Sequence, residues 1–96
     1  MELKGKVVKV NPTESFGANG FKKAELWIEV LDGEYSQTLS IEAVKEKADE
    51  IQSIKIGSEI KVFFNLRGRV WTNKEGVEKV FNSIQLWKYE QIKIEF

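Results

Sequence analysis

The chain contains no cysteine and no histidine among its 96 residues. Without them there is no disulfide framework, no thiolate or imidazole site for zinc, and no copy of the commonest general base. Carboxylates remain, but glycosidase-type catalysis needs two of them converging in a cleft, and here they are scattered along the chain. We therefore expect a protein that is not an enzyme and that has no metal site and no cofactor.

The chain also lacks a long apolar run. Its opening, Met1 to Gly5, carries charges where a secretory signal would be apolar, and no stretch approaches the length that spans a bilayer. These absences predict a cytoplasmic protein with no membrane partner. A chain of 96 residues supports a modest core, so we expect one domain covering residues 1–96.

Neither sign of charge is in excess, since 15 basic residues balance 15 acidic ones. A neutral net charge by itself counts against nucleic-acid binding. The charges are unevenly distributed, however: residues 1–23 carry net +3, residues 24–60 net −6 and residues 61–96 net +3. If the fold brings the two basic ends together on one face, the protein can therefore have a locally positive groove despite its neutral net charge.

Short runs of Val, Ile, Phe and Trp separated by polar residues predict a mostly β chain. The expected strands cover residues 3–10, 21–31, about 35–41, 60 to about 72, and 78 onward. Residues 11–20 collect the only proline and two glycines, which indicates a loop. Asp32-Gly33 and residues 73–76 are turn signals.

One segment has a helical period. Val44, Ala48 and Ile51 fall at i, i+4 and i+7, which predicts a short amphipathic helix. Five strands with one helix between the third and fourth is the order of the OB-fold, a five-stranded Greek-key barrel. An SH3-like barrel would not normally place its helix there, so we predict an OB-fold.

The fourth expected strand has two chemically different faces. Alternate residues form an apolar face that we expect to be core: Ile60, Val62, Phe64, Leu66 and Val70. The other residues form a basic and aromatic face: Lys61, Phe63, Asn65, Arg67, Arg69 and Trp71. Guanidinium groups bind phosphate and aromatic rings stack on bases, so this face predicts binding of a single-stranded nucleic acid.

Trp71 is the foremost candidate for a base platform, and Arg67 and Arg69 are the foremost phosphate ligands. Phe63 and Trp27 have an alternative role in packing or in a subunit contact. The remaining candidates are weaker members of the same track: Phe21, Tyr35, Lys23, Lys61, Lys74 and Lys79. The register of the last strand, which contains Trp87 and Tyr89, stays open.

Residues 56–84 also carry a family resemblance. Ile56-Gly57-Ser58-x-Ile60-x-Val62, then Leu66-x-x-Arg69-x-Trp71-Thr72-Asn73-x-x-Gly76, and Ile84 in the next strand resemble bacterial single-stranded-DNA-binding proteins of the replicative type. Over nearly its whole length the chain also resembles small uncharacterised OB-fold proteins common in Bacteroidetes. The shared features there are the opening Met-Glu-Leu-Lys-Gly-Lys-Val-Val-Lys-Val and the late Leu86-Trp87-Lys88.

The first resemblance implies that Trp71 stacks on a base beside Arg69, that the hairpin at about residues 70–79 is a DNA-wrapping loop, and that the domain forms dimers or tetramers. Two departures are expected to reduce the DNA footprint or the recruitment of repair proteins. Glu25 and Glu29 flank Trp27, and the sequence ends at Phe96 without the family's acidic tail.

We therefore expect sequence-tolerant binding of single-stranded DNA, with RNA as an alternative ligand, by a homodimer or homotetramer acting in replication, recombination or repair. Two alternatives stay open. One is an OB domain that binds only proteins, in which the exposed aromatic residues form a subunit or partner interface. The other is an oligosaccharide-binding domain, although sugar-binding sites seldom need arginine side chains such as Arg67 and Arg69.

Overall fold

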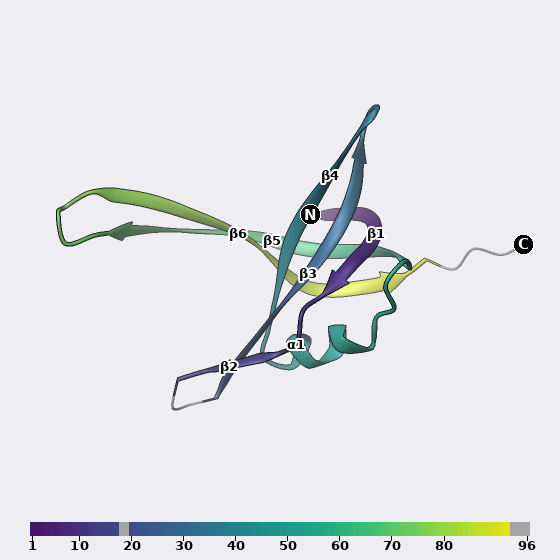
Figure 1. Ribbon diagram of the computed structural model, residues 1–96, viewed down its shortest axis with the longest axis horizontal. Coiled ribbons are helices and arrows are strands. Elements are labelled where there is room, and N and C mark those ends of the chain that lie inside the picture. The colour runs from purple at the N-terminus through teal and green to yellow at the C-terminus, as the bar shows by residue number, and fades with distance from the viewer. Residues whose placement is uncertain (18–19, 93–96) are drawn as a thin grey trace, which may run out of the picture.

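The computed structural model describes residues 1–17 and 20–92. Its elements are β1 (Glu2–Val10), β2 (Glu14–Phe16), β3 (Phe21–Asp32), β4 (Tyr35–Val44), α1 (Glu46–Glu50), a 3-10 turn at Ile51–Ser53, β5 (Glu59–Thr72) and β6 (Glu78–Gln91). The predicted strands and helix are all present (Figure 1). The sixth strand, β2, lies inside the segment that we expected to be loop, where it pairs with the start of β3.

Five of the strands close into a barrel. β1 pairs with both β3 and β5, β5 with β6, and β3 with β4. The ring is completed where β4 meets β6 in parallel, with Ile41 opposite Ile84 and Glu42 opposite Gln85. This closed barrel, with a helix between β4 and β5, is the predicted OB-fold.

The core lies inside this barrel and under the helix. Its fully or almost fully buried side chains are Val7, Ala24, Leu26, Ile28, Ile41, Ala43, Ala48, Ile51, Ile54, Ile60, Val62 and Leu86. They come from alternate positions of the strands and from one side of the helical segment. The spacing predicted this face for Ile60 and Val62 of β5 and for Ala48 and Ile51, but it did not predict the register of β6, in which Leu86 is buried. The predicted helix starts later than expected, because β4 continues to Val44 before α1 begins at Glu46.

Two residues expected in the core are outside it. Leu66 and Val70 are each 61% exposed, although they continue the inward-facing row of Ile60 and Val62. The reason is length: β5 has 14 residues, and its second half runs beyond the barrel together with β6. The two strands project from the body as a long hairpin, on the left in Figure 1.

Gly5 marks a close contact between strands. A Cβ atom at this position would lie 2.1 Å from Ile28 Cγ2 and 2.7 Å from the Glu29 carbonyl oxygen. β1 can therefore approach β3 this closely only because residue 5 has no side chain.

Candidate nucleic-acid interface

The hairpin of β5 and β6 beyond the barrel, residues 66–84, is called the arm. Its strands are paired in register from Leu66 opposite Ile84 to Thr72 opposite Glu78. The turn between them is held by the Asn73 side chain, whose Oδ1 accepts hydrogen bonds of 2.9 Å from the backbone N–H groups of Glu75 and Val77. Asparagine is favoured in turns because its side chain can bond the backbone in this way.

Residues that are directly opposite each other in an antiparallel pair point to the same face of the sheet. One face of the arm therefore carries Arg67 with Ser83, Arg69 with Phe81, and Trp71 with Lys79. This is the basic and aromatic row of β5, extended by its partners on β6.

Two aromatic rings of this face are in contact. The Trp71 and Phe81 ring centroids are 6.4 Å apart and the rings are inclined at 72°, an edge-to-face arrangement. Trp71 is 48% exposed and Phe81 is 53% exposed, so each ring still offers a surface on which a base can stack.

The barrel end of the arm forms one wall of an open groove of about 700 Å³, called the arm groove. Its lining includes Gly68 and Asn82, which are paired on the other face of the arm, whereas Trp71 and Lys79 do not line it. The opposite wall and the floor come from β3 and β4. The lining residues are Phe21, Lys23, Glu42, Val44, Arg67, Gly68, Arg69, Phe81, Asn82, Ser83 and Gln85. The groove thus joins the first residues of β3 to the arm, although the two are more than 40 residues apart in the sequence.

The cations of the arm groove differ in how far they are already engaged. Lys23 Nζ lies 2.5 Å from Glu42 Oε1, so that charge is neutralised. Arg67 Nε donates a 2.9 Å hydrogen bond to the neutral Gln85 Oε1, which orients the guanidinium without cancelling its charge. Arg69 makes no ion pair with any residue that the structure describes. Two guanidinium charges are therefore available to a polyanion.

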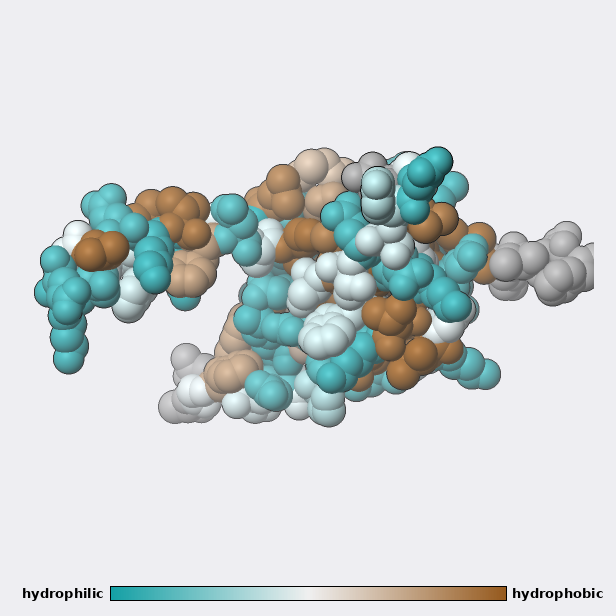
Figure 2. Space-filling model, turned by 45° about the horizontal axis from the view of Figure 1, so that its top comes forward, coloured by the Kyte–Doolittle hydropathy of each residue, from teal (hydrophilic) through white to brown (hydrophobic). Residues whose placement is uncertain are grey.

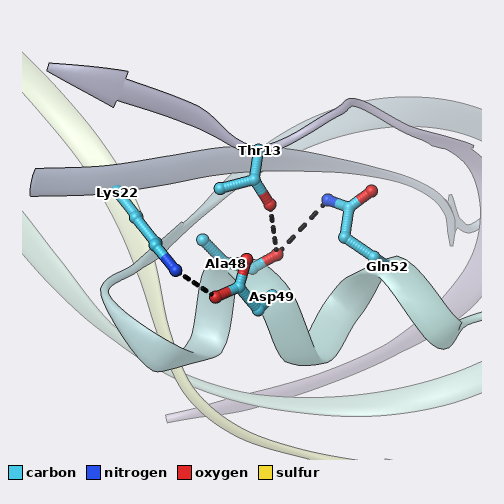
Figure 3. Close-up of polar contacts among 5 residues, drawn as sticks. All are labelled: Thr13, Lys22, Ala48, Asp49 and Gln52. Carbon is cyan, nitrogen blue, oxygen red and sulfur yellow. Dashed lines mark hydrogen bonds and ion pairs between the residues drawn. The ribbon is translucent and has the colours of Figure 1, made fainter. Parts of the chain in front are cut away.

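The start of β3 is anchored to the helix through Lys22, the residue between Phe21 and Lys23 (Figure 3). Lys22 Nζ donates a 2.8 Å hydrogen bond to Asp49 Oδ2. That bond raises the pKa of the Lys22 ammonium group and lowers the pKa of the Asp49 carboxyl group. Thr13 Oγ1 also donates to the Ala48 carbonyl oxygen, at 3.1 Å, which ties the loop after β1 to the same helix.

Trp27 is on the outer face of the barrel and does not line the arm groove. It is partly buried, Lys9 Nζ lies 4.7 Å from its ring centroid, and its Nε1 donates a 3.4 Å hydrogen bond to Glu25 Oε2. The surroundings of this indole are therefore both cationic and anionic.

Lys61 and Phe63 share a strand face with Arg67 but lie at its barrel end, outside the arm groove. Phe63 packs against Trp87, with ring centroids 5.5 Å apart. Lys61 and Lys88 lie over the Phe63 ring, with Nζ 5.3 and 5.2 Å from its centroid. Lys61 also forms a 3.3 Å ion pair with Glu2.

The remaining candidates lie apart from the groove. Tyr35 is 80% exposed at the end of the β3–β4 hairpin. It is opposite Asp32, so it points to the other side of the sheet from Trp27. Lys74 is in the turn of the arm, and Lys79 lies opposite Trp71.

Sequence reasoning missed the contribution of β6 to the groove: Phe81, Asn82, Ser83 and Gln85. A signal was available, because a hairpin turn at residues 73–76 sets the register of its strands. Counting back from that turn places Phe81 opposite Arg69, as observed.

Within residues 1–17 and 20–92, no group of three or more acidic side chains is placed to hold a metal ion. The same part of the chain contains no helix long and apolar enough to cross a membrane.

Comparison with solved structures finds the same fold in Rim1, a mitochondrial single-stranded DNA binding protein from S. cerevisiae. The two superpose with a TM-score of 0.69 at 14% sequence identity, over 97% of this chain and 93% of that one. No curated protein matches the sequence. Residues 2–90 match the family model described as a domain of unknown function, DUF3127. The chain therefore belongs to the DUF3127 family, and its fold is that of an OB-fold protein.

Proposed function

We propose that this protein binds single-stranded DNA in the arm groove, without base specificity and without catalysing a reaction. The observation that carries the proposal is the composition of that groove. It holds two guanidinium groups that have no carboxylate partner within the described residues, together with two exposed phenylalanine rings, Phe21 and Phe81. Cations for the backbone and rings for the bases are the two requirements of single-strand binding.

In the proposed complex, Arg67 and Arg69 bind phosphates while Phe81 and Phe21 stack on bases from opposite walls. Trp71 extends the platform along the arm, because its ring touches Phe81. Each stacked base contributes about 1–3 kcal/mol, so two or three platforms with two phosphate contacts give measurable affinity. The binding falls as salt rises, because each phosphate contact releases counterions.

The fold comparison supports the proposal, because Rim1 is a single-stranded DNA binding protein with the same barrel. We place the protein in the cytoplasm, in replication, recombination or repair. Assembly into dimers or tetramers, which lengthens the DNA track, is part of the proposal. We also propose that the chain is related to the small OB-fold proteins of Bacteroidetes that its sequence resembles.

The test is a titration of labelled oligo-dT of about 30 nucleotides, long enough for more than one OB-fold site, followed by tryptophan fluorescence at two salt concentrations. We expect quenching whose midpoint moves to higher DNA concentration as salt rises. Phe81→Ala should weaken binding, and Leu31→Ala, at an exposed position outside the groove, should not. Absence of binding at low salt would refute the proposal, and oligo-U in parallel measures the preference for DNA over RNA.

A second candidate function is protein binding with no role for nucleic acid. It is favoured by the Phe63–Trp87 pair on the barrel wall, where Trp87 is 49% exposed. Such an interface would depend little on salt, whereas DNA binding depends on it strongly. Trp87→Ser should abolish partner binding under this second function and leave oligo-dT binding intact under the first.

A further inference from the structure

A second hollow adjoins the arm groove on the side of the helix. It has a volume of about 410 Å³ and is called the helix hollow. Its lining residues are Gly20, Phe21, Lys22, Lys45, Glu46 and Asp49. Phe21 lines both this hollow and the arm groove, so its ring, which is 43% exposed, lies at the boundary between them. A strand that leaves the arm groove over Phe21 therefore brings its next nucleotide to the helix hollow.

Backbone and side-chain bonds hold the walls of the helix hollow together. The Lys45 backbone N–H donates a 2.8 Å hydrogen bond to the Lys22 carbonyl oxygen. Lys22 Nζ in turn donates to Asp49 Oδ2 on α1 (Figure 3). The last residue of β4, Val44, lines the arm groove, and the residue after it, Lys45, lines the helix hollow. The two recesses are thus adjacent both at Phe21 and at the end of β4.

Lys45 has a backbone conformation that lysine rarely adopts. Its φ is 56° and its ψ is −128°, and it is the one residue other than glycine with a positive φ in residues 1–17 and 20–92. Glycine would occupy this conformation at a lower cost. Strained residues of this kind are concentrated at binding and catalytic sites, and this one lines the helix hollow.

The charges of the helix hollow favour a base over a phosphate group. Lys22 and Asp49 are paired with each other, so they add no net charge. Lys45 and Glu46 form no ion pair with a residue that the structure describes. A phosphate would be attracted by Lys45 but repelled by Glu46. The edge of a base carries both donors and acceptors, so it can bond to both side chains.

Guanine suits this pair of side chains better than the other bases do. Its Watson–Crick edge has two adjacent donors, N1–H and the N2 amino group, beside the acceptor O6. The two donors match the two oxygens of the Glu46 carboxylate, and O6 can accept from the Lys45 ammonium group. Adenine and cytosine offer one amino group beside an acceptor nitrogen. Thymine offers one N–H between two oxygens that would repel a carboxylate.

We propose that the helix hollow binds one base of the strand held in the arm groove, and that it prefers guanine. The base lies against the Phe21 ring, while Glu46 and Lys45 bond to its edge. Figure 2 shows open space beside the base of the arm, through which a strand can pass. The inference rests on the proposed function and adds to it, because the arm groove tolerates any base whereas the helix hollow selects one.

The experiment compares four oligonucleotides of about 30 nucleotides by tryptophan fluorescence. One is oligo-dT, and the others carry guanine, adenine or cytosine at every third position. We expect the guanine oligonucleotide to bind at least about fivefold more tightly than oligo-dT, because a bidentate contact to a base edge discriminates by this factor or more. Equal affinity for all four, or a preference for adenine or cytosine, would overturn the inference.

Glu46→Gln is the test variant, because glutamine keeps the size of the side chain and replaces one acceptor oxygen with a donor. It should lose the preference for guanine and keep the affinity for oligo-dT. The matched control is Glu34→Gln, which changes an exposed carboxylate in the turn between β3 and β4. The control should keep the preference. A folded Glu46→Gln protein that still prefers guanine as wild type does would contradict the role of the helix hollow.

Lys45→Gly separates binding from folding. Glycine tolerates the positive φ, so the urea midpoint should not fall, whereas loss of the ammonium group should reduce the preference for guanine. Reduced binding without reduced stability cannot result from unfolding. An unchanged preference in Lys45→Gly would show that this side chain does not contact the base.

The helix hollow can also be tested without a strand. Titration with millimolar deoxyguanosine monophosphate should shift the backbone amide NMR signals of Lys22, Lys45 and Glu46, and thymidine monophosphate should not. Absence of these shifts would overturn the hollow as a base site. If the shifts occur but oligo-dT does not bind, the proposed function fails and the hollow stands. If oligo-dT binds with salt dependence but guanine adds nothing, the reverse holds.

Discussion

Arg69 and Lys23 both line the arm groove, but their immediate partners differ. Lys23 is paired with the Glu42 carboxylate, whereas Arg69 has no ion pair within the described residues. A neutralised lysine attracts phosphate weakly, and an unpaired guanidinium offers two parallel donors to it. Substitution of Arg69 is therefore a more informative test of phosphate binding than substitution of Lys23.

Arg69→Gln should lower the affinity for oligo-dT and flatten its salt dependence. Loss of one phosphate contact reduces the slope of log K against log salt by about 0.7 for a single strand. Fluorescence titrations at several salt concentrations measure that slope. Lys55→Gln, which removes an exposed cation outside the groove, is the control. An unchanged slope in Arg69→Gln would show that this side chain does not contact phosphate.

At Gly5, the close packing of β1 against β3 requires that the residue has no side chain. Gly5→Ala should destabilise the protein by about 1–3 kcal/mol, because the new Cβ would overlap Ile28 and the Glu29 backbone in a packed interior. Gly68→Ala is the control, since its Cβ would meet mainly Asn82 Oδ1, at 3.1 Å. Urea unfolding measures both changes. Equal stability of Gly5→Ala and wild type would contradict the close contact between β1 and β3.

Among the elements, α1 has only five residues and is too short to be stable alone. Buried Ala48 and the hydrogen bonds from Thr13 and Lys22 hold it against the barrel. The helix in turn positions the start of β3, and with it one wall of the arm groove. The packing of α1 against the barrel should depend on pH, because Lys22 bonds to the titratable carboxyl group of Asp49.

The Lys22 hydrogen bond lowers the pKa of Asp49 below its ordinary value of 3.8 in the folded state. A carboxyl group with a depressed folded pKa stabilises the protein above its unfolded pKa, and this contribution is lost as pH falls through the folded value. The difference in unfolding free energy between wild type and Asp49→Asn should therefore shrink on acidification below about pH 4.

Urea titrations at a series of pH values test this prediction. Glu46→Gln is the control on the same helix, because Glu46 forms no ion pair with any described residue. A wild-type advantage over Asp49→Asn that persists undiminished at low pH would refute the role of the pair. The effect is small in any outcome, since the pair is exposed and salt screens it.

The whole molecule divides into a barrel that carries the core and an arm that carries the groove chemistry. None of the core residues lies within residues 67–83. Joining Leu66 directly to Ile84 through an Asn-Gly turn should therefore leave the barrel folded, because these two residues are already opposite each other. The same change should abolish oligo-dT binding, because it removes both arginines and Phe81.

Circular dichroism and thermal unfolding check the first part of this prediction, and fluorescence titration checks the second. A shortened protein that still binds oligo-dT as wild type does would move the DNA site to the barrel wall, where Trp27 and Phe63 lie. Loss of the fold would show that the barrel depends on the arm.

The OB-fold order and the alternation of faces followed from the sequence alone. Strands have a period of two and helices of 3.6, so the inward residues Ile60 and Val62 of β5 and Ala48 and Ile51 of the helical segment were predictable from spacing. The row of Arg67, Arg69 and Trp71 on one face followed from the same rule.

Which of those residues lie close together depends on the packing of the whole chain. Periodicity identifies the face on which Leu66 lies, but the place where the barrel ends determines whether that face is buried. Closure of the barrel brings Phe21 and Lys23 to the arm and leaves Lys61, Phe63 and Tyr35 elsewhere. Contacts between distant segments depend on where the whole chain packs, and local spacing carries no information about them.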